Sequence, residues 1–297
     1  DQSDQKGCIV LTGSQTYHLM KGVSESLAGR IRIIEMPPLS LRELIDAANS
    51  PHPYVPTRIT EPKHVKDLDI WSLIHRGSMP ELQDDSMDWD SFYSDYVSAY
   101  LERDVRDLIN VQDETKFYSF MVACAARSAQ LFNATDIGNA IDVDHKTAKA
   151  WLSVLQASNI VRVIQPFWPN VDKRLSKTPK VFFMDTGLVC HLTRWTTPDQ
   201  LRNGAVAGHV FETFVVSEVL KSYMNAGTNL RDVWFYRDAK KREIDLVIQE
   251  GHVLHPVEIK MAATVGSDVV KNFGCLDSLS DYEVGFGHVV CQTDEPY

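Results

Sequence analysis

Several common signatures are missing from this chain. Its five cysteines lie far apart without a CxxC pair, which argues against a disulfide framework or a zinc site and favours the reduced cysteines of a cytoplasmic protein. No apolar run approaches the roughly 20 residues of a membrane span, and the polar, acidic start is no secretory signal. A GxxxxGK[ST] phosphate loop is also missing, so we expect no ATP hydrolysis by the chain as given.

Positive charge is not in excess either. The formal net charge is −10, and it divides into −9 for residues 1–114, +4 for residues 115–200 and −5 for residues 201–297. This balance excludes a uniformly basic nucleic-acid binder. Only the middle segment has the sign expected for contact with phosphates. The acidic C-terminal segment is compatible with a metal site, because a bound cation offsets clustered carboxylates.

The length of 297 residues suits two or three domains, and a content of 44% hydrophobic and 24% charged residues is ordinary for a globular protein. The chain has no initiator methionine and a strand is predicted almost at once, so we expect a fragment of a longer protein.

Two short runs, at 243–248 and 256–260, carry the most informative polar residues. Both are rich in β-branched residues and predict strands joined by a hairpin turn. Side chains two residues apart share one face of a strand, so Glu258 and Lys260 should stand side by side, with Asp245 opposite on the paired strand. Two carboxylates and an ammonium there could hold a divalent metal and orient a water against a phosphate.

This arrangement resembles the D…ExK signature of the PD-(D/E)xK restriction-endonuclease-like superfamily. The resemblance implies that Asp245 and Glu258 bind Mg²⁺ or Mn²⁺ and that Lys260 activates water or stabilises charge on the phosphate. It also implies a glutamate on a preceding helix, where Glu212 is the natural match and Glu218 the second choice. Two alternatives remain: solvated charges on an exposed sheet face, and an intact fold that binds nucleic acid or protein without cutting it.

The first 38 residues indicate the distal part of a nucleotide-binding core. The run CIVLTGSQ predicts a buried strand that ends in polar residues, and SESLAGR and a second strand follow. Together with MPPLSLREL, these motifs resemble a prokaryotic AAA-type family of ATPases that has a C-terminal domain of unknown function. The resemblance implies that Ser14 and Gln15 end the sensor strand and that Arg30 is a sensor or an arginine finger for the γ-phosphate. It further implies ATP binding only in a longer parent protein, and it allows self-association through the ATPase part.

Residues 39–114 are expected to be mostly helical. Ser40 is the predicted N-cap of one helix, and Glu43 completes a capping box. Apolar residues at helical spacing from Trp89 to Ile109 predict a longer helix.

The middle segment, residues 115–200, predicts a winged helix-turn-helix. Its expected helices cover 115–129, 135–141 and 145–156, and its expected wing strands cover 161–167 and 180–184. The third helix begins with residues of the kind that a recognition helix offers to DNA: His145, Lys146, Thr147 and Lys149. The wing has a basic rim, made of Lys173, Arg174, Lys177 and Lys180. Asp185 is expected to cap the next helix. Winged helices also serve as protein-interaction modules, so DNA is one possible partner and a protein the other.

The expected fold class is therefore α/β multi-domain. Its four parts are a distal remnant of a P-loop ATPase core (1–38), a helical subdomain (39–114), a winged helix (115–200) and a restriction-endonuclease-like domain (201–297). Two functions remain open. The first is a metal-dependent enzyme acting on DNA, and the second is a non-catalytic regulatory or assembly module of an ATPase. Carboxylates of Asp245 and Glu258 that converge within metal-bridging distance, near Lys260 and over an open cleft, would favour the enzyme. Carboxylates pointing apart, or a cleft filled by Trp234 or Tyr236, would favour the module.

Overall fold

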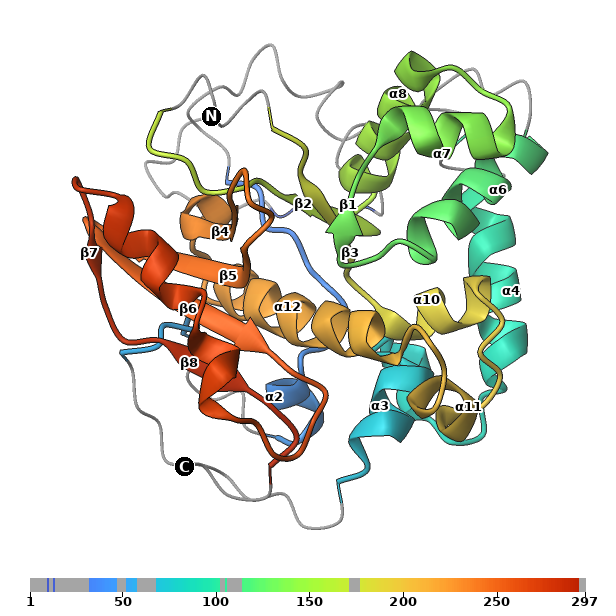
Figure 1. The fold of residues 1–297 in the computed structure, drawn as a ribbon. Helices are drawn as coiled ribbons and strands as arrows, with labels where there is room; N and C mark the ends of the chain where they lie inside the picture. Colours follow the sequence, from blue (N-terminus) through green and yellow to red (C-terminus); the bar gives the residue numbers. More distant parts are fainter. Residues whose placement is uncertain are drawn as a thin grey trace, which may run out of the picture.

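A computed structural model describes residues 10, 13, 32–46, 52–57, 68–101, 105, 114–170 and 177–293. In Figure 1 the long helix α12 (Ala207–Asn225) lies between the C-terminal strands on one side and a group of helices on the other. α12 buries residues around most of its circumference, as a helix packed on several sides must. It belongs to a continuous core cluster that extends from Trp71 to Ile259.

The first described helices are short. α2 (Leu41–Leu44) begins at Ser40, whose hydroxyl accepts from the backbone of Glu43 while the Glu43 carboxylate accepts from the backbone of Ser40. The predicted capping box is therefore confirmed. α3 (Ile70–Arg76), η1 (Pro80–Gln83) and α4 (Trp89–Tyr100) follow. α4 covers the first part of the long helix that was predicted from Trp89, and much of the remainder lies outside the described residues.

The middle segment combines helices with a small antiparallel sheet. Its elements are α6 (Glu114–Ala125), β1 (Gln130–Leu131), α7 (Ala134–Ile141), α8 (His145–Ala157), β2 (Val161–Ile164) and β3 (Lys180–Phe183). In the described residues the strand order is β1-β3-β2. The predicted first helix is too long at its C-terminal end, because the chain turns with Ala129 at positive φ and forms β1. The other two helices are confirmed, and the side chains of Asn133 and Asp144 cap them.

The C-terminal segment is built around a mixed sheet. The chain reaches this segment through α10 (Thr186–Leu192) and α11 (Pro198–Arg202). The elements of the segment itself are α12, η3 (Leu230–Asp232), β4 (Val233–Arg237), β5 (Glu243–Glu250), β6 (Val253–Ile259), η4 (Ser267–Val270), η5 (Phe273–Ser278), β7 (Glu283–Val284) and β8 (His288–Val290). Strands β4, β5 and β6 are antiparallel, whereas β7 and β8 each pair with β6 in parallel. The predicted hairpin is present, and Gly251 with positive φ begins its turn slightly later than expected. Asp185 caps α10 as predicted.

The two sheets are connected directly. Beyond β2, the backbone N–H of Phe167 donates to the carbonyl of Phe235 in β4 at 2.5 Å, and that of Phe235 donates to Gln165 at 3.3 Å. β2 therefore ends earlier than predicted, and the residues from Gln165 to Phe167 pair with β4 instead. This pairing also brings the middle segment against the C-terminal segment, so that β3 lies close to the start of α12 (Figure 1).

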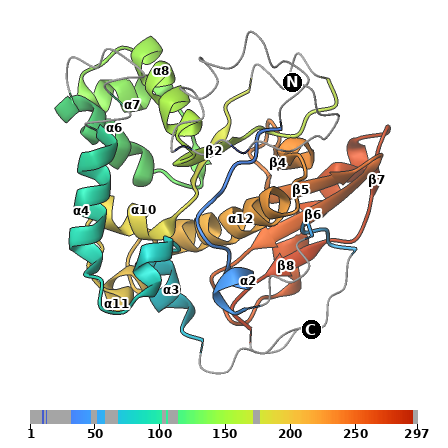
Figure 2. The ribbon, with the colours of Figure 1, turned by 180° about the vertical axis from the view of Figure 1, so that it is seen from behind.

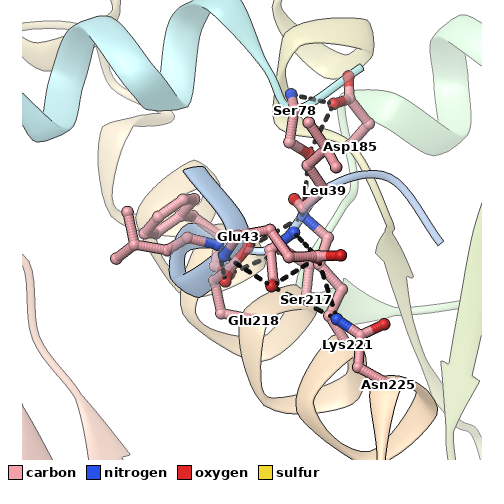
Figure 3. A network of polar contacts seen from close by, with 11 residues as sticks. Leu39, Glu43, Ser78, Asp185, Ser217, Glu218, Lys221 and Asn225 are labelled. Atoms are coloured by element: carbon pink, nitrogen blue, oxygen red, sulfur yellow. Dashed lines mark hydrogen bonds and ion pairs between the residues drawn. The ribbon is translucent and has the colours of Figure 1, made fainter. Parts of the chain in front are cut away.

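A buried ammonium joins segments that are distant in the sequence (Figure 3). Lys221 on α12 is 2% exposed and donates to the carbonyl of Leu39 (3.0 Å), to Oγ of Ser78 (2.9 Å) and to Oε1 of Glu218 (2.9 Å). The other carboxylate oxygen of Glu218 accepts from the backbone of Leu41 at 2.6 Å, and Figure 2 shows α2 lying against α12. Glu218 therefore holds the start of α2 in place.

Among the described residues, no helix combines the length and the apolar character that crossing a membrane requires. The mixture of helices with two sheets in this part of the chain agrees with the expected α/β class. The winged helix and the nuclease-like fold stay predictions.

Candidate carboxylate–lysine site

The predicted C-terminal residues come together beside α12. Glu212 is on this helix, Asp245 is on β5, and Glu258 is near the end of β6 with Lys260 just after it. The register that pairs Leu246 with Val257 places Asp245 opposite Glu258. Nζ of Lys260 lies 2.6 Å from Oε1 of Glu258 and 3.9 Å from Oδ2 of Asp245. Both carboxylates therefore face one ammonium group.

The two carboxylates are buried, whereas the lysine reaches solvent. The side chain of Glu258 is 8% exposed and that of Asp245 is 12% exposed, compared with 40% for Lys260. The alternative interpretation as solvated charges on an exposed sheet face is therefore wrong for Asp245 and Glu258. Burying such groups is costly unless cations or hydrogen bonds compensate them, which makes this cluster unusual among ordinary strand residues.

Asp245 is held in place by the backbone, but Glu258 is only half satisfied. Oδ2 of Asp245 accepts from the N–H of Ile259 at 2.8 Å, which fixes the carboxylate across the two strands. Oε2 of Glu258 is buried and has no hydrogen-bond partner among the described residues. Burial and the neighbouring charge of Asp245 raise the pKa of Glu258 to about 7. A buried carboxylate oxygen without a hydrogen-bond partner is stabilised by binding a proton or a cation.

Two further charged residues complete the cluster, and sequence reasoning did not assign either to it. Lys180 at the start of β3 is 3% exposed, and its Nζ lies 2.8 Å from Oε1 of Glu212 and 2.7 Å from Oε1 of Glu243. Glu243 also forms an ion pair with Arg237. The prediction that Lys180 belongs to a basic rim of the wing is therefore wrong, because its side chain points into the protein. The available signal was a lysine at the head of an otherwise apolar strand.

Charges within the cluster affect one another strongly. Burial acts to lower the pKa of Lys180, but Glu212, Glu243 and Asp245 outweigh it and raise that pKa, so the ammonium stays charged. Burial, with Asp245 and Glu243, raises the pKa of Glu212 to about 7 despite its contact with Lys180. For Glu243 burial acts in the same direction, but Lys180 and Arg237 prevail and lower the pKa. Glu243 is thus the most firmly ionised partner of Lys180.

A hollow of about 320 Å³ opens on one side of this cluster, beside Lys180, Glu212 and Glu243, and its lining does not include Asp245, Glu258 or Lys260. The middle segment contributes residues of β1 and β3 to its lining, and the other side comes from α12, β4 and β5; the lining residues are Ala129, Gln130, Leu131, Lys180, His209, Glu212, Arg237 and Glu243. A ligand in the hollow would therefore contact both segments of the chain. Trp234 and Tyr236, the side chains considered above as possible fillers of the cleft, pack into a second apolar cluster with Phe167.

The other predicted site residues are not part of this cluster. His145, Lys146 and Lys149 are exposed at the start of α8. The hydroxyl of Thr147 donates to Asp144 at 2.7 Å and so takes part in the helix cap. The remaining predicted contacts lie outside the described residues: Ser14, Gln15 and Arg30 for the nucleotide, and Lys173 and Arg174 for DNA.

Within the described ranges, no group of three or more histidine, cysteine, aspartate and glutamate side chains has an arrangement that could hold a metal ion. Any divalent ion bound at Asp245 and Glu258 would thus need other ligands to complete its coordination.

Sequence comparisons match three parts of the chain. Residues 1–45 match an AAA domain, residues 67–199 match a domain of unknown function (DUF8612), and residues 207–297 match another domain of unknown function (DUF4143). These matches support an AAA-type ATPase-associated protein that contains domains of unknown function.

The curated relatives that match the chain are uncharacterized proteins and therefore indicate no activity. An uncharacterized protein of Mycobacterium bovis and one of Mycobacterium tuberculosis are each 25% identical over 262 residues, which covers 86% of this chain and 53% of each relative. The chain thus spans about half the length of the curated relatives it matches. No solved structure matches it.

Proposed function

We propose that the cluster around Asp245, Glu258 and Lys260 is a divalent-metal site for hydrolysis of nucleic-acid phosphodiesters, in a protein associated with an AAA-type ATPase. The observation that carries the proposal is the position of the Lys260 ammonium, which faces both carboxylates. Glu212 on α12 is close enough for the charge of Asp245 to raise its pKa. Helix glutamate, strand aspartate, strand glutamate and lysine follow the order of the PD-(D/E)xK signature. The burial of Asp245 and Glu258 sets these two carboxylates apart from ordinary surface charges.

The residues fit a hydrated Mg²⁺ or Mn²⁺. Magnesium is usually bound through one or two carboxylates together with several waters, so Asp245 and Glu258 are sufficient as protein ligands. Oε2 of Glu258 is buried without a partner among the described residues, and it is the oxygen that would gain most from a cation. A bound divalent ion would supply a polarised phosphate and a more acidic water.

The side chains of the protein have distinct tasks in this proposal. Burial acts to lower the pKa of Lys260, but its hydrogen bond to Glu258 and the charge of Asp245 raise that pKa overall. Lys260 therefore stays protonated at neutral pH and stabilises charge on the phosphate instead of accepting a proton. Asp245 keeps its orientation through the N–H of Ile259.

We further propose that the middle segment binds DNA as a winged helix. Its element order α6-β1-α7-α8-β2-β3 and its strand order β1-β3-β2 support this fold. The start of α8 exposes His145, Lys146 and Lys149, and the N-terminal residues of a recognition helix are those that reach the bases. The segment also has the positive net charge that contact with phosphates requires.

A second candidate is a non-catalytic assembly module, which one observation favours. Lys180 already neutralises Glu212 and Glu243, so half of the acidic cluster is stabilised without any metal. In that case the cluster joins the middle and C-terminal segments and does not act on a substrate.

A cleavage assay separates these candidates. The purified chain would be incubated with supercoiled, linear and branched DNA, with Mg²⁺, Mn²⁺ or EDTA. We expect cutting that needs the metal and falls by about 100-fold or more in Lys260→Met and Asp245→Asn. Lys240→Met is the matched control, because Lys240 is exposed on the loop between β4 and β5 and should leave cutting unchanged. Absence of both cutting and metal binding by calorimetry would refute the proposal and favour the assembly module.

A further inference from the structure

We infer that Lys180 is an internal cation that takes, between Glu212 and Glu243, the place of a second divalent ion. The inference rests on the proposed metal site at Asp245 and Glu258 and deepens it, since it limits that site to one ion and adds a residue from outside the C-terminal segment.

The cluster divides into two unequal halves. In the first half, the Lys180 ammonium contacts Glu212 at 2.8 Å and Glu243 at 2.7 Å. In the second half, which contains Asp245, Glu258 and Lys260, the Lys260 ammonium contacts only one oxygen of Glu258. The other oxygen is buried without a partner among the described residues. The protein thus satisfies one pair of carboxylates by itself and leaves an oxygen of the other pair open to an external cation.

The surroundings of Lys180 suit a permanently placed ammonium. Glu212 and Glu243 are only partly exposed, and carboxylates that share one ammonium repel each other unless that cation lies between them. The ammonium group is a compact point charge on a flexible apolar stem, and Nζ lies 5.6 Å from the ring centre of Phe235. β3 is anchored on both sides by β1 and β2, so the sheet of the middle segment determines where this charge is placed.

The consequence is a defined metal stoichiometry. With Lys180 in place, the carboxylates of Glu212 and Glu243 are paired with its ammonium group, and a divalent ion is confined to Asp245 and Glu258. Because the hollow of about 320 Å³ borders Lys180, Glu212 and Glu243, an ion from solvent could reach this pair of glutamates once the ammonium is removed.

Titration of the full chain with Mn²⁺, followed by calorimetry and by the paramagnetic resonance of free Mn²⁺, tests the inference. We expect one ion per chain for the unaltered protein and for the exposed-lysine control Lys240→Met, and two for Lys180→Met, which keeps the apolar stem and loses the charge. A single ion at unchanged affinity in a folded Lys180→Met would overturn the inference and leave the proposed function standing. No Mn²⁺ binding by any of the proteins would overturn both.

A second comparison decides the matter even if Lys180→Met does not fold. In the otherwise unaltered chain, Glu212→Gln should change Mn²⁺ affinity by no more than about twofold, because Lys180 and not the metal occupies Glu212. Asp245→Asn should lower it by about tenfold or more, since it removes a ligand. An equal loss in the two variants would make Glu212 a metal ligand and overturn the inference.

Discussion

Replacing Lys221 with methionine should lower the free energy of unfolding by about 3 kcal/mol, because it removes a buried charge that several segments share. The ammonium is almost fully buried and donates to Leu39, Ser78 and Glu218. Methionine retains most of the apolar stem, so the change tests the charge more than the packing.

The magnitude follows from what remains after the substitution. Breaking a buried ion pair by removing one partner costs about 3–5 kcal/mol. Glu218 keeps the donor from the backbone of Leu41 and is 19% exposed, which places the expected loss at the low end of that range. The hydrogen bonds to the carbonyl of Leu39 and the hydroxyl of Ser78, at about 1 kcal/mol each, are part of this total and are not added to it.

Urea unfolding monitored by tryptophan fluorescence and circular dichroism gives the required free energies. Lys240→Met is the matched control and should stay within about 0.5 kcal/mol of the unaltered chain, as exposed substitutions usually do. A double-mutant cycle with Glu218→Gln should show a coupling energy of about 1 kcal/mol or more. A loss below about 1 kcal/mol in Lys221→Met, together with no coupling, would show that the reasoning about this network is wrong.

Two further predictions concern pH and DNA. Because the pKa of Glu258 is raised from 4.5 to about 7, its proton stabilises the native state fully below pH 4.5, and this contribution is lost as the pH rises through about 7. After allowance for solvent screening around Lys260, Glu258→Gln should be more stable than the unaltered chain by roughly 1–2 kcal/mol at pH 8 and equally stable near pH 4. Urea unfolding midpoints, measured in EDTA at both pH values, test this. A stability difference that does not change with pH would contradict it. Lys146→Ala and Lys149→Ala should each weaken duplex binding several-fold and reduce the salt slope by about 1, measured by fluorescence anisotropy, with Lys240→Ala as control; unchanged salt slopes would argue against contact through α8.

Features that depend on near neighbours in the sequence were predictable. The capping box of Ser40 and Glu43 and the cap at Asp185 follow from side chains that bind the backbone three residues away. The two-residue period of a strand likewise placed Glu258 and Lys260 next to each other. In such cases the determining contact lies within one turn or one strand, so the sequence contains all of the required information.

Which glutamate of α12 joins the cluster was a question of tertiary packing. Glu212 and Glu218 are six residues apart, which is about 1.7 turns of an α-helix, so they face different directions. The sequence made both candidates and favoured Glu212. The structure pairs Glu212 with Lys180 and Glu218 with Lys221, because the orientation of α12 between the sheet and α2 decides which face meets which neighbour.

The sequence by itself determined the strand pair, the positions of Asp245 and Glu258 on it with Lys260 nearby, and the helices of the middle segment. Only the tertiary structure decided that Lys180, from a strand of the middle segment, enters the acidic cluster and that the carboxylates are buried. The reason is physical: strand and helix periods act over a few residues, whereas the ion pairs of Lys180 depend on how β3, α12 and β5 meet, and that arrangement arises from packing across the whole core.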